Sequence, residues 1–304
     1  MNSNFDFVKN RKYYFIVSLI LVLIGVVSLL TMGMNLGVDF KGGSRVQVHV
    51  GKTFSEEQIK KDAEQLGLKP GSVTTAGDNR DIAVIQFADP ITKEDYAKLT
   101  KAMQSKYGKH VDLQQSTVDS MVSRELARSA LYAVLIASIG IIIYITIRFE
   151  FKFAFAAVLA LLHDAFLVIT IFSLFHIEVD LPFIAAVLTI VGYSINDTIV
   201  IFDRIRDNLK KTKIKKIQDI EDMVNLSIRQ TLTRSINTVL TVLVCAIALF
   251  IFGGESIRSF TLALIIGLVF GAYSSIFIAS QIWVSLKERE LKKKKKLAPA
   301  NNEA

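Results

Sequence analysis

Cysteine is nearly absent from this sequence, and so are the motifs of common enzymes. The only cysteine, Cys245, lies in an apolar run, which excludes an internal disulfide framework and a cysteine metal site. The stretch GVDFKGG (Gly37 to Gly43) lacks the Gly-Lys-Ser/Thr ending of a phosphate loop. The 4 histidines are scattered, and no Ser/His/Asp set accompanies them. The sequence therefore predicts no enzyme, no metal site and no cofactor.

Apolar residues are abundant, making up 51% of the 304 residues. A membrane helix needs about 20 apolar residues to cross a hydrocarbon core of about 30 Å. The first long run is interpreted as a retained anchor, because no A-x-A cleavage site follows it. We therefore predict a polytopic α-helical membrane protein with six transmembrane helices. The predicted spans are Tyr13 to Met32, Ala130 to Ile147, Phe153 to Phe175, Leu181 to Phe202, Ser235 to Phe252 and Phe260 to Leu286.

The net charge of +8 follows this pattern of spans. Lysine and arginine gather before the first span, between the second and third, between the fourth and fifth, and after the sixth, which predicts that both termini are cytoplasmic. Topology explains the basic residues, so nucleic acid is not an expected partner. The predicted boundaries are 1–12 for a cytoplasmic N-terminal segment, 13–32 for the first helix, 33–129 for an outside domain, 130–286 for the other five helices with a cytoplasmic loop at 203–234, and 287–304 for a basic tail that contains Lys292 to Lys296.

The outside segment has the character of a small soluble domain. SRVQVHV (Ser44 to Val50) alternates like a strand, and Ser55 to Gly67 has the cap, early acids and final glycine of a helix. Residues 71–76 and 81–87 read as two strands around a turn, 92–108 as a second helix with a threonine cap, and 110–119 as a last strand. This βαββαβ order predicts an extracytoplasmic α+β domain of the ferredoxin-like kind, with an irregular loop as the alternative.

Polar residues near the cytoplasmic end of the fourth span are candidates for function. Asn196 and Asp197 lie inside this span, and Arg234 opens the fifth. A charged group at bilayer depth is costly and is functional by default. The alternatives are a structural Asp197 tied to Arg204, and an Arg234 that snorkels to the interface as an ordinary anchor.

Two other features occur in the third and sixth spans. His163 and Asp164 are the deepest ionisable pair, and they suit either a proton relay or a structural pair satisfied by Asn196 or Ser194. The sixth span repeats small residues at every fourth position, which favours close helix packing. The members of this stripe are Ala263, Gly267, Gly271, Ser275 and Ala279.

Four strings in the sequence resemble the SecD/SecF family of bacterial protein export membrane proteins, relatives of the RND (resistance-nodulation-division) transporters. They are GVDFKGG after the first span, LLHDAFLVITIFSL in the third, GYSINDTIVIFDRIRDN at the fourth and TLTRSINTVLTVL entering the fifth. The resemblance singles out Gly37, Asp39, Gly42 and Gly43 as a motif after the first helix. It also links the acid of the GYSIND block and the arginine of the TRSINT block, here Asp197 and Arg234, to proton conduction.

The resemblance implies half of a twelve-helix bundle in the bacterial cytoplasmic membrane. Its expected partners are SecD, the SecYEG channel with its SecA motor, YidC and YajC, the exported polypeptide chain and membrane lipids. The implied function is use of the proton motive force to assist Sec-dependent export. In the mechanistic hypothesis, an ionised Asp197 pairs with Arg234 and holds spans four and five together until protonation releases them.

Two other classes of function stay open at this point. An RND-type exporter of small molecules or lipids would use the same buried acids but would be expected to have two large outside domains. A non-transporting assembly factor would need no titratable acid at depth. Neutral substitution of Asp197 separates the second class from the transporters, and co-purification with SecD separates protein export from efflux.

Overall fold

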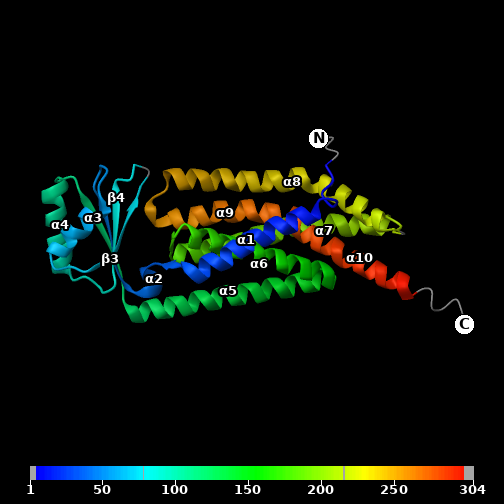
Figure 1. Cartoon of the computed structure of the whole chain (residues 1–304), viewed down its shortest axis with the longest axis horizontal. Coiled ribbons are helices and arrows are strands. Elements are labelled where there is room, and N and C mark those ends of the chain that lie inside the picture. The colour runs from blue at the N-terminus through cyan, green and yellow to red at the C-terminus, as the bar shows by residue number, and fades with distance from the viewer. Residues whose placement is uncertain (1–4, 78, 215, 298–304) are drawn as a thin grey trace, which may run out of the picture.

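Six helices in the described part of the chain are long and apolar enough to cross a membrane (Figure 1). The structure is a computed structural model that describes residues 5–77, 79–214 and 216–297. The spans are α1 (Arg11–Thr31), α5 (Ser120–Arg148), α6 (Phe151–Leu174), α7 (Leu181–Lys211), α8 (Ile217–Phe252), and a continuous sixth span formed by α9 (Arg258–Ser274), the π-helical turn η2 (Ser275–Ala279) and α10 (Ser280–Leu297). The predicted number of spans is confirmed. The first four residues, Lys215 and the end of the predicted tail at 298–304 lie outside the described residues.

The outside domain has the predicted βαββαβ order. Its elements are β2 (Gly43–His49), α3 (Glu56–Gln65), β3 (Pro70–Ala76), β4 (Ile82–Phe87), α4 (Lys93–Tyr107) and β5 (Asp112–Val118). All paired strands are antiparallel in the order β3-β4-β2-β5, which is the ferredoxin-like arrangement. Thr92 caps α4 by accepting a hydrogen bond from Asp95 N (3.1 Å), whereas Ser55 at the start of α3 makes no such bond.

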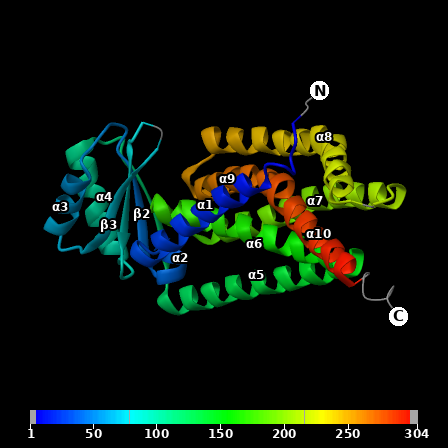
Figure 2. The ribbon, with the colours of Figure 1, turned by 45° about the vertical axis from the view of Figure 1, so that its right-hand side comes forward.

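The two helices of this domain cover only one face of its sheet. Val46, Val48 and Ile85 point to this face and pack with Leu99 and Met103 of α4. The opposite face of the sheet is turned toward the membrane helices (Figures 1 and 2). The domain is therefore held above the bundle with the polar side of its sheet facing the helix ends.

The bundle has a packed interior and an exposed shell. About half of the central stretch of α6 and of the sixth span is buried, against 17% for α1, 11% for α8 and 6% for α5. Helix α7 is 44% buried over its apolar stretch, because it packs against α9, α8 and α6 and leaves Gly192, Tyr193 and Asn196 exposed. Consequently, α6, α7 and the sixth span form the core, and α1, α5 and α8 surround it.

Residues 203–234 differ from the predicted loop. Among the described residues of this segment, all are helical except for 212–214 and 216, because α7 continues to Lys211 and α8 begins at Ile217. The segment contains no glycine or proline to end a helix, and Ile205, Ile220 and Ile228 join one buried apolar cluster. Asp219 caps α8 by accepting a hydrogen bond from Lys216 N (2.8 Å). The two helices thus extend beyond the predicted spans as a packed hairpin.

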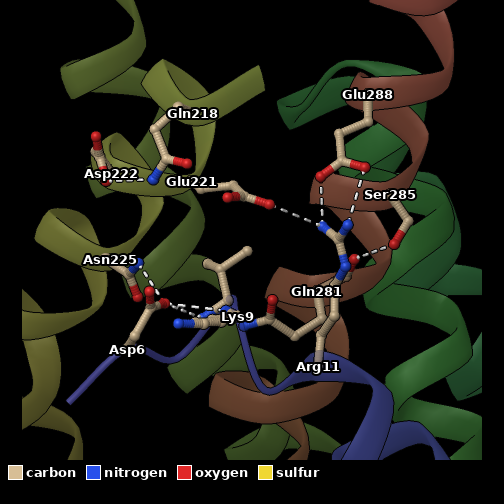
Figure 3. Close-up of polar contacts among 11 residues, drawn as sticks. Asp6, Lys9, Arg11, Gln218, Glu221, Asp222, Asn225, Gln281, Ser285 and Glu288 are labelled. Atoms are coloured by element: carbon tan, nitrogen blue, oxygen red, sulfur yellow. Dashed lines mark hydrogen bonds and ion pairs between the residues drawn. The ribbon is translucent and has the colours of Figure 1, made fainter. Parts of the chain in front are cut away.

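Residues just before α1 and at its start contact helices from the second half of the chain (Figure 3). Phe7 N donates a hydrogen bond to Asn225 Oδ1 (2.8 Å) on α8. The guanidinium of Arg11 binds both carboxylate oxygens of Glu288 on α10 and lies 3.6 Å from Glu221 on α8. The start of the chain is thereby joined to α8 and α10 at the end of the bundle opposite the domain.

Candidate functional site

The glycines after α1 form a tight junction between the domain and the bundle. Gly42 and Gly43 have φ values of +80° and +108°, which side chains other than glycine rarely adopt. A Cβ on Gly43 would lie 2.1 Å from Phe87 O, and one on Gly42 would lie 2.9 Å from Ser120 Cα at the start of α5. Both positions therefore require glycine for conformation and for space.

Asp39 and Gly37 connect this junction to α7. The chain passes through β1 (Asn35–Leu36) and α2 (Val38–Lys41), and β1 pairs in parallel with β6 (Glu178–Val179). Gly37 N donates to Val179 O (2.8 Å), and Asp39 Oδ2 accepts from Leu181 N (2.9 Å), the first residue of α7. The predicted motif thus fixes the base of the domain to the adjacent end of the helix that carries Asp197.

Two acids beside this junction, the buried Asp180 and the partly buried Glu178, were missed by the sequence reasoning. Asp180 caps α7 by accepting from Phe183 N (3.0 Å) and also accepts from Ser259 Oγ (2.6 Å), while Glu178 lies 3.6 Å from Arg45. Burial raises the pKa of the Glu178 carboxyl and that of the Asp180 carboxyl. The available signal was the pair of acids in a loop without lysine or arginine, HIEVD, between two spans.

Asp164 is held in a complete hydrogen-bond network. Its Oδ1 lies 3.1 Å from His163 Nδ1, and its Oδ2 accepts from Ser194 Oγ and Ser274 Oγ, both at 2.6 Å. His163 Nε2 in turn lies 3.1 Å from Ser18 Oγ on α1. The network joins α1, α6, α7 and α9. The sequence left open whether Asn196 or Ser194 satisfies the pair, and in the structure Ser194 does. This geometry is that of a structural clamp.

The small-residue stripe of the sixth span packs directly on α7. A Cβ on Gly267 would lie 2.3 Å from Ile190 Cδ1, and one on Gly271 would lie 3.2 Å from Ser194 Cβ. Ser275, the first residue of the π-helical turn η2, shares a 2.8 Å hydrogen bond with Thr198. The stripe therefore brings α9 and α7 close enough for their hydroxyl groups to bond.

Asp197 is also buried but has a different environment. Its side chain is 7% exposed, and its Oδ2 is buried without a hydrogen-bond partner among the described residues. Ser235 on α8 is 1% exposed, and its hydroxyl also has no partner within that part of the chain. Ser235 and the charge of Arg234 are the polar groups of α8 that act on Asp197, but the geometry of a hydrogen bond to Ser235 is not reached.

The ion pair in the mechanistic hypothesis is absent from this conformation. In the described chain, Asp197 forms no ion pair with Arg234 or with Arg204. Arg234 is exposed, whereas the next residue on α8, Ser235, is buried. Asn196 is also exposed, one position from Asp197 on the open side of α7. The structure thus separates the five predicted coupling residues into a bonded pair, His163 and Asp164, and a group on the open α7–α8 side.

These features define a membrane protein of transporter architecture. It has a six-helix half-bundle, one ferredoxin-like domain inserted after the first helix, and carboxylates buried on adjacent core helices. Within the described residues no group of three or more His, Cys, Asp or Glu side chains is arranged to hold a metal ion.

Comparison with known proteins agrees with this architecture. Residues 98–289 match the family model described as "Protein export membrane protein SecD/SecF, C-terminal", and residues 27–53 match "SecD/SecF GG Motif". The chain is 46% identical over 296 residues to the protein translocase subunit SecF of Alicyclobacillus acidocaldarius, covering 96% of each chain. It is 51% identical over 291 residues to the protein translocase subunit SecDF of Bacillus subtilis, of which it spans 39%.

A solved structure shows the same fold. The crystal structure of SecDF from Thermus thermophilus, a translocon-associated membrane protein, matches 94% of this chain and 39% of its own with a TM-score of 0.85 and 32% identity. A SecDF structure in a "Super-membrane-facing form" matches with a TM-score of 0.70. The chain belongs to the SecD/SecF family. Within the family it is a protein translocase subunit of the SecF type, a non-enzymatic multi-pass protein of the bacterial cytoplasmic membrane.

Proposed function

We propose that this subunit couples proton movement at Asp197 to Sec-dependent protein export, together with a SecD partner. The observation that carries the proposal is the contrast between two membrane-buried acids. Asp164 is fully hydrogen bonded, whereas Asp197 retains a buried oxygen without a partner on the described chain. A buried carboxylate without full compensation is costly, so its charge is easily changed by a proton.

The membrane potential supplies enough energy for such a switch. Moving one elementary charge through 100 mV releases about 2.3 kcal/mol. That amount biases a two-state element by more than tenfold. Protonation of Asp197 from the outside and release of the proton to the cytoplasm would therefore shift α8 relative to α7, and Arg234 would supply the charge that favours the ionised state.

The proton path is completed by a second half-bundle. The Bacillus relative is a SecDF chain of which this chain spans 39%, which supports SecD as the partner. Asn196 and Arg234 lie exposed on α7 and α8, and a Cβ on Gly192 would meet nothing within 4 Å, so this side is suited to the helices of SecD. We place the SecYEG channel with its SecA motor, YidC, YajC and the exported chain around this pair, with both termini in the cytoplasm.

The test is export of a secreted reporter protein in cells whose only copy of this subunit carries Asp197→Asn. Export should fall to the level of a deletion strain while membrane level and SecD co-purification stay unchanged. Asp203→Asn is the matched control, because Asp203 lies six positions later on α7 and is ion paired with Arg148 and Arg206. Normal export by Asp197→Asn would remove the proposed role of this carboxylate.

A further inference from the structure

The two sides of α7 differ in how their polar groups are satisfied. On the α9 side, Ser194 donates to Asp164, and Thr198 bonds to Ser275 at 2.8 Å. On the α8 side, Asp197 Oδ2 and Ser235 Oγ are both buried and both without a partner in the described residues. The two residues lie on packed helices, and Ser235 is near enough to Asp197 to act on its carboxyl. Buried polar atoms of neighbouring helices that stay unbonded indicate a contact that another conformation completes.

Few charged groups surround this contact. From α8, Arg234 acts on Asp197. From α6, Asp164 and His163 are linked to α7 through Ser194, one turn away from Asp197. From α9 and η2, the polar groups nearest α7 are the hydroxyls of Ser274 and Ser275. A proton at Asp197 would therefore change the charge of an otherwise sparsely charged contact.

Helix α8 packs against α7 and α9 along one side, leaves most of its apolar stretch exposed, and reaches the domain. Only 11% of its apolar stretch is buried, against 44% for α7. Its outer end, with Phe250 and Gly253, lines a cavity of about 400 Å³. The opposite wall of this cavity is the open sheet face of the domain, with Gln47, His49 and Gln114. A small movement of α8 against α7 would therefore change the position of the domain relative to the helices.

We propose that Ser235 is the positioning residue that converts the charge of Asp197 into a position of α8, an inference that rests on the proposed function. When Asp197 is ionised, the Ser235 hydroxyl donates to the carboxylate and draws α8 toward α7. When a proton from outside forms the carboxyl O–H bond, a neutral hydrogen bond remains, which is about half as strong. Helix α8 then moves away, and loss of the proton to the cytoplasm restores the first state.

The experiment compares Ser235→Ala, Ser235→Thr and Thr231→Ala. Thr231 is a matched control, because it lies one turn earlier on the same helix, is 4% exposed, and bonds only to backbone oxygens of its own helix, Ser227 O and Ile228 O, both at 3.1 Å. Reporter export is measured as the proton motive force is lowered with an uncoupler and as the outside pH is varied. Membrane level and thermal unfolding in detergent are measured for each variant.

Ser235→Ala should lower export at least fivefold and flatten its dependence on outside pH, with membrane level unchanged. Ser235→Thr should restore export to within twofold, and Thr231→Ala should stay within twofold. Wild-type behaviour of Ser235→Ala alongside a defective Asp197→Asn would overturn the inference and leave the proposed function standing. Equal losses in Ser235→Ala and Thr231→Ala, with lowered membrane level, would also overturn it, because both would then be packing effects. Normal export by Asp197→Asn would instead reject the proposed function itself.

Discussion

The two sides of α7 show how one helix serves both as a fixed support and as a movable contact. Toward α9, glycines allow close approach, and Asp164 collects hydrogen bonds from two serines. Toward α8, Asp197 is also buried but is not bonded at Oδ2 within the described chain. The difference teaches that burial alone does not mark a functional acid. The completeness of its hydrogen bonding separates a clamp from a switch.

The largest expected effect tests the clamp. Asp164→Ala leaves the buried hydroxyls of Ser194 and Ser274 without their acceptor, so we expect the free energy of unfolding to fall by about 3 kcal/mol. Asp197→Asn should leave it unchanged or raise it, because it removes an uncompensated buried charge. Thermal or denaturant unfolding of the purified subunit in detergent measures both. The comparison fails if Asp197→Asn is the more destabilised of the two.

A smaller effect distinguishes the two faces of α7 by size alone. Gly267→Ala forces a methyl group to within 2.3 Å of Ile190 as the helices now stand, and over-packing of this kind costs about 1–3 kcal/mol. Gly192→Ala is the control, because its methyl group would meet nothing within 4 Å in this chain. Unfolding of the isolated subunit should report only the Gly267 change. An equal loss of unfolding free energy in both variants would mean that Gly192 is packed against a neighbour rather than exposed.

Gly192 can also sharpen the proposal about the partner. A larger side chain, as in Gly192→Leu, should leave the isolated subunit stable but reduce co-purification of SecD several-fold, because the face that it enlarges is exposed. The same substitution should have no effect on SecD recovery if the partner binds elsewhere. The exposed residue Leu226 lies on the α7–α8 hairpin far from this face, and Leu226→Ala serves as the control.

The smallest effect concerns pH at the outside junction. Burial raises the pKa of Glu178 and of Asp180, so the folded state holds these protons more readily than the unfolded chain. Stability from this source is complete below the ordinary carboxyl pKa and is lost as pH rises through the raised value. The unfolding temperature should therefore rise as pH is lowered from 7 toward 5, and Glu178→Gln should reduce the slope. An unchanged slope in Glu178→Gln and in Asp180→Asn would show that neither acid contributes.

The sequence predicted the architecture well because its signals are periodic and local. Apolar runs marked the six spans, and the alternation of SRVQVHV with the threonine before α4 predicted the domain. The loop at 203–234 was misjudged because hydropathy measures fit to lipid, while helix ends depend on caps and on glycine or proline, which that segment lacks.

The site was predictable in its residues but not in its contacts. Asp164 and Asp197 both stand out as acids in apolar helices, and no local pattern says which one is satisfied by other helices. That distinction depends on Ser274, which is 110 positions from Asp164, and on Ser235, whose hydroxyl is unremarkable in the sequence. The ion pair between Asp197 and Arg234 stays a prediction. It is not formed in this conformation, in which Arg234 is exposed and the next residue on α8, Ser235, is buried.

The contacts of Phe7 and Arg11 also bear on the order in which the protein folds. Phe7 bonds to Asn225, and Arg11 binds Glu288, so the partners of this segment lie 218 and 277 positions later in the chain. During synthesis, Arg11 is made long before its acceptor Glu288. The contacts of Arg11 with Glu221 and then with Glu288 can therefore form only after α8 and α10 have been synthesised, so they belong to late steps of folding.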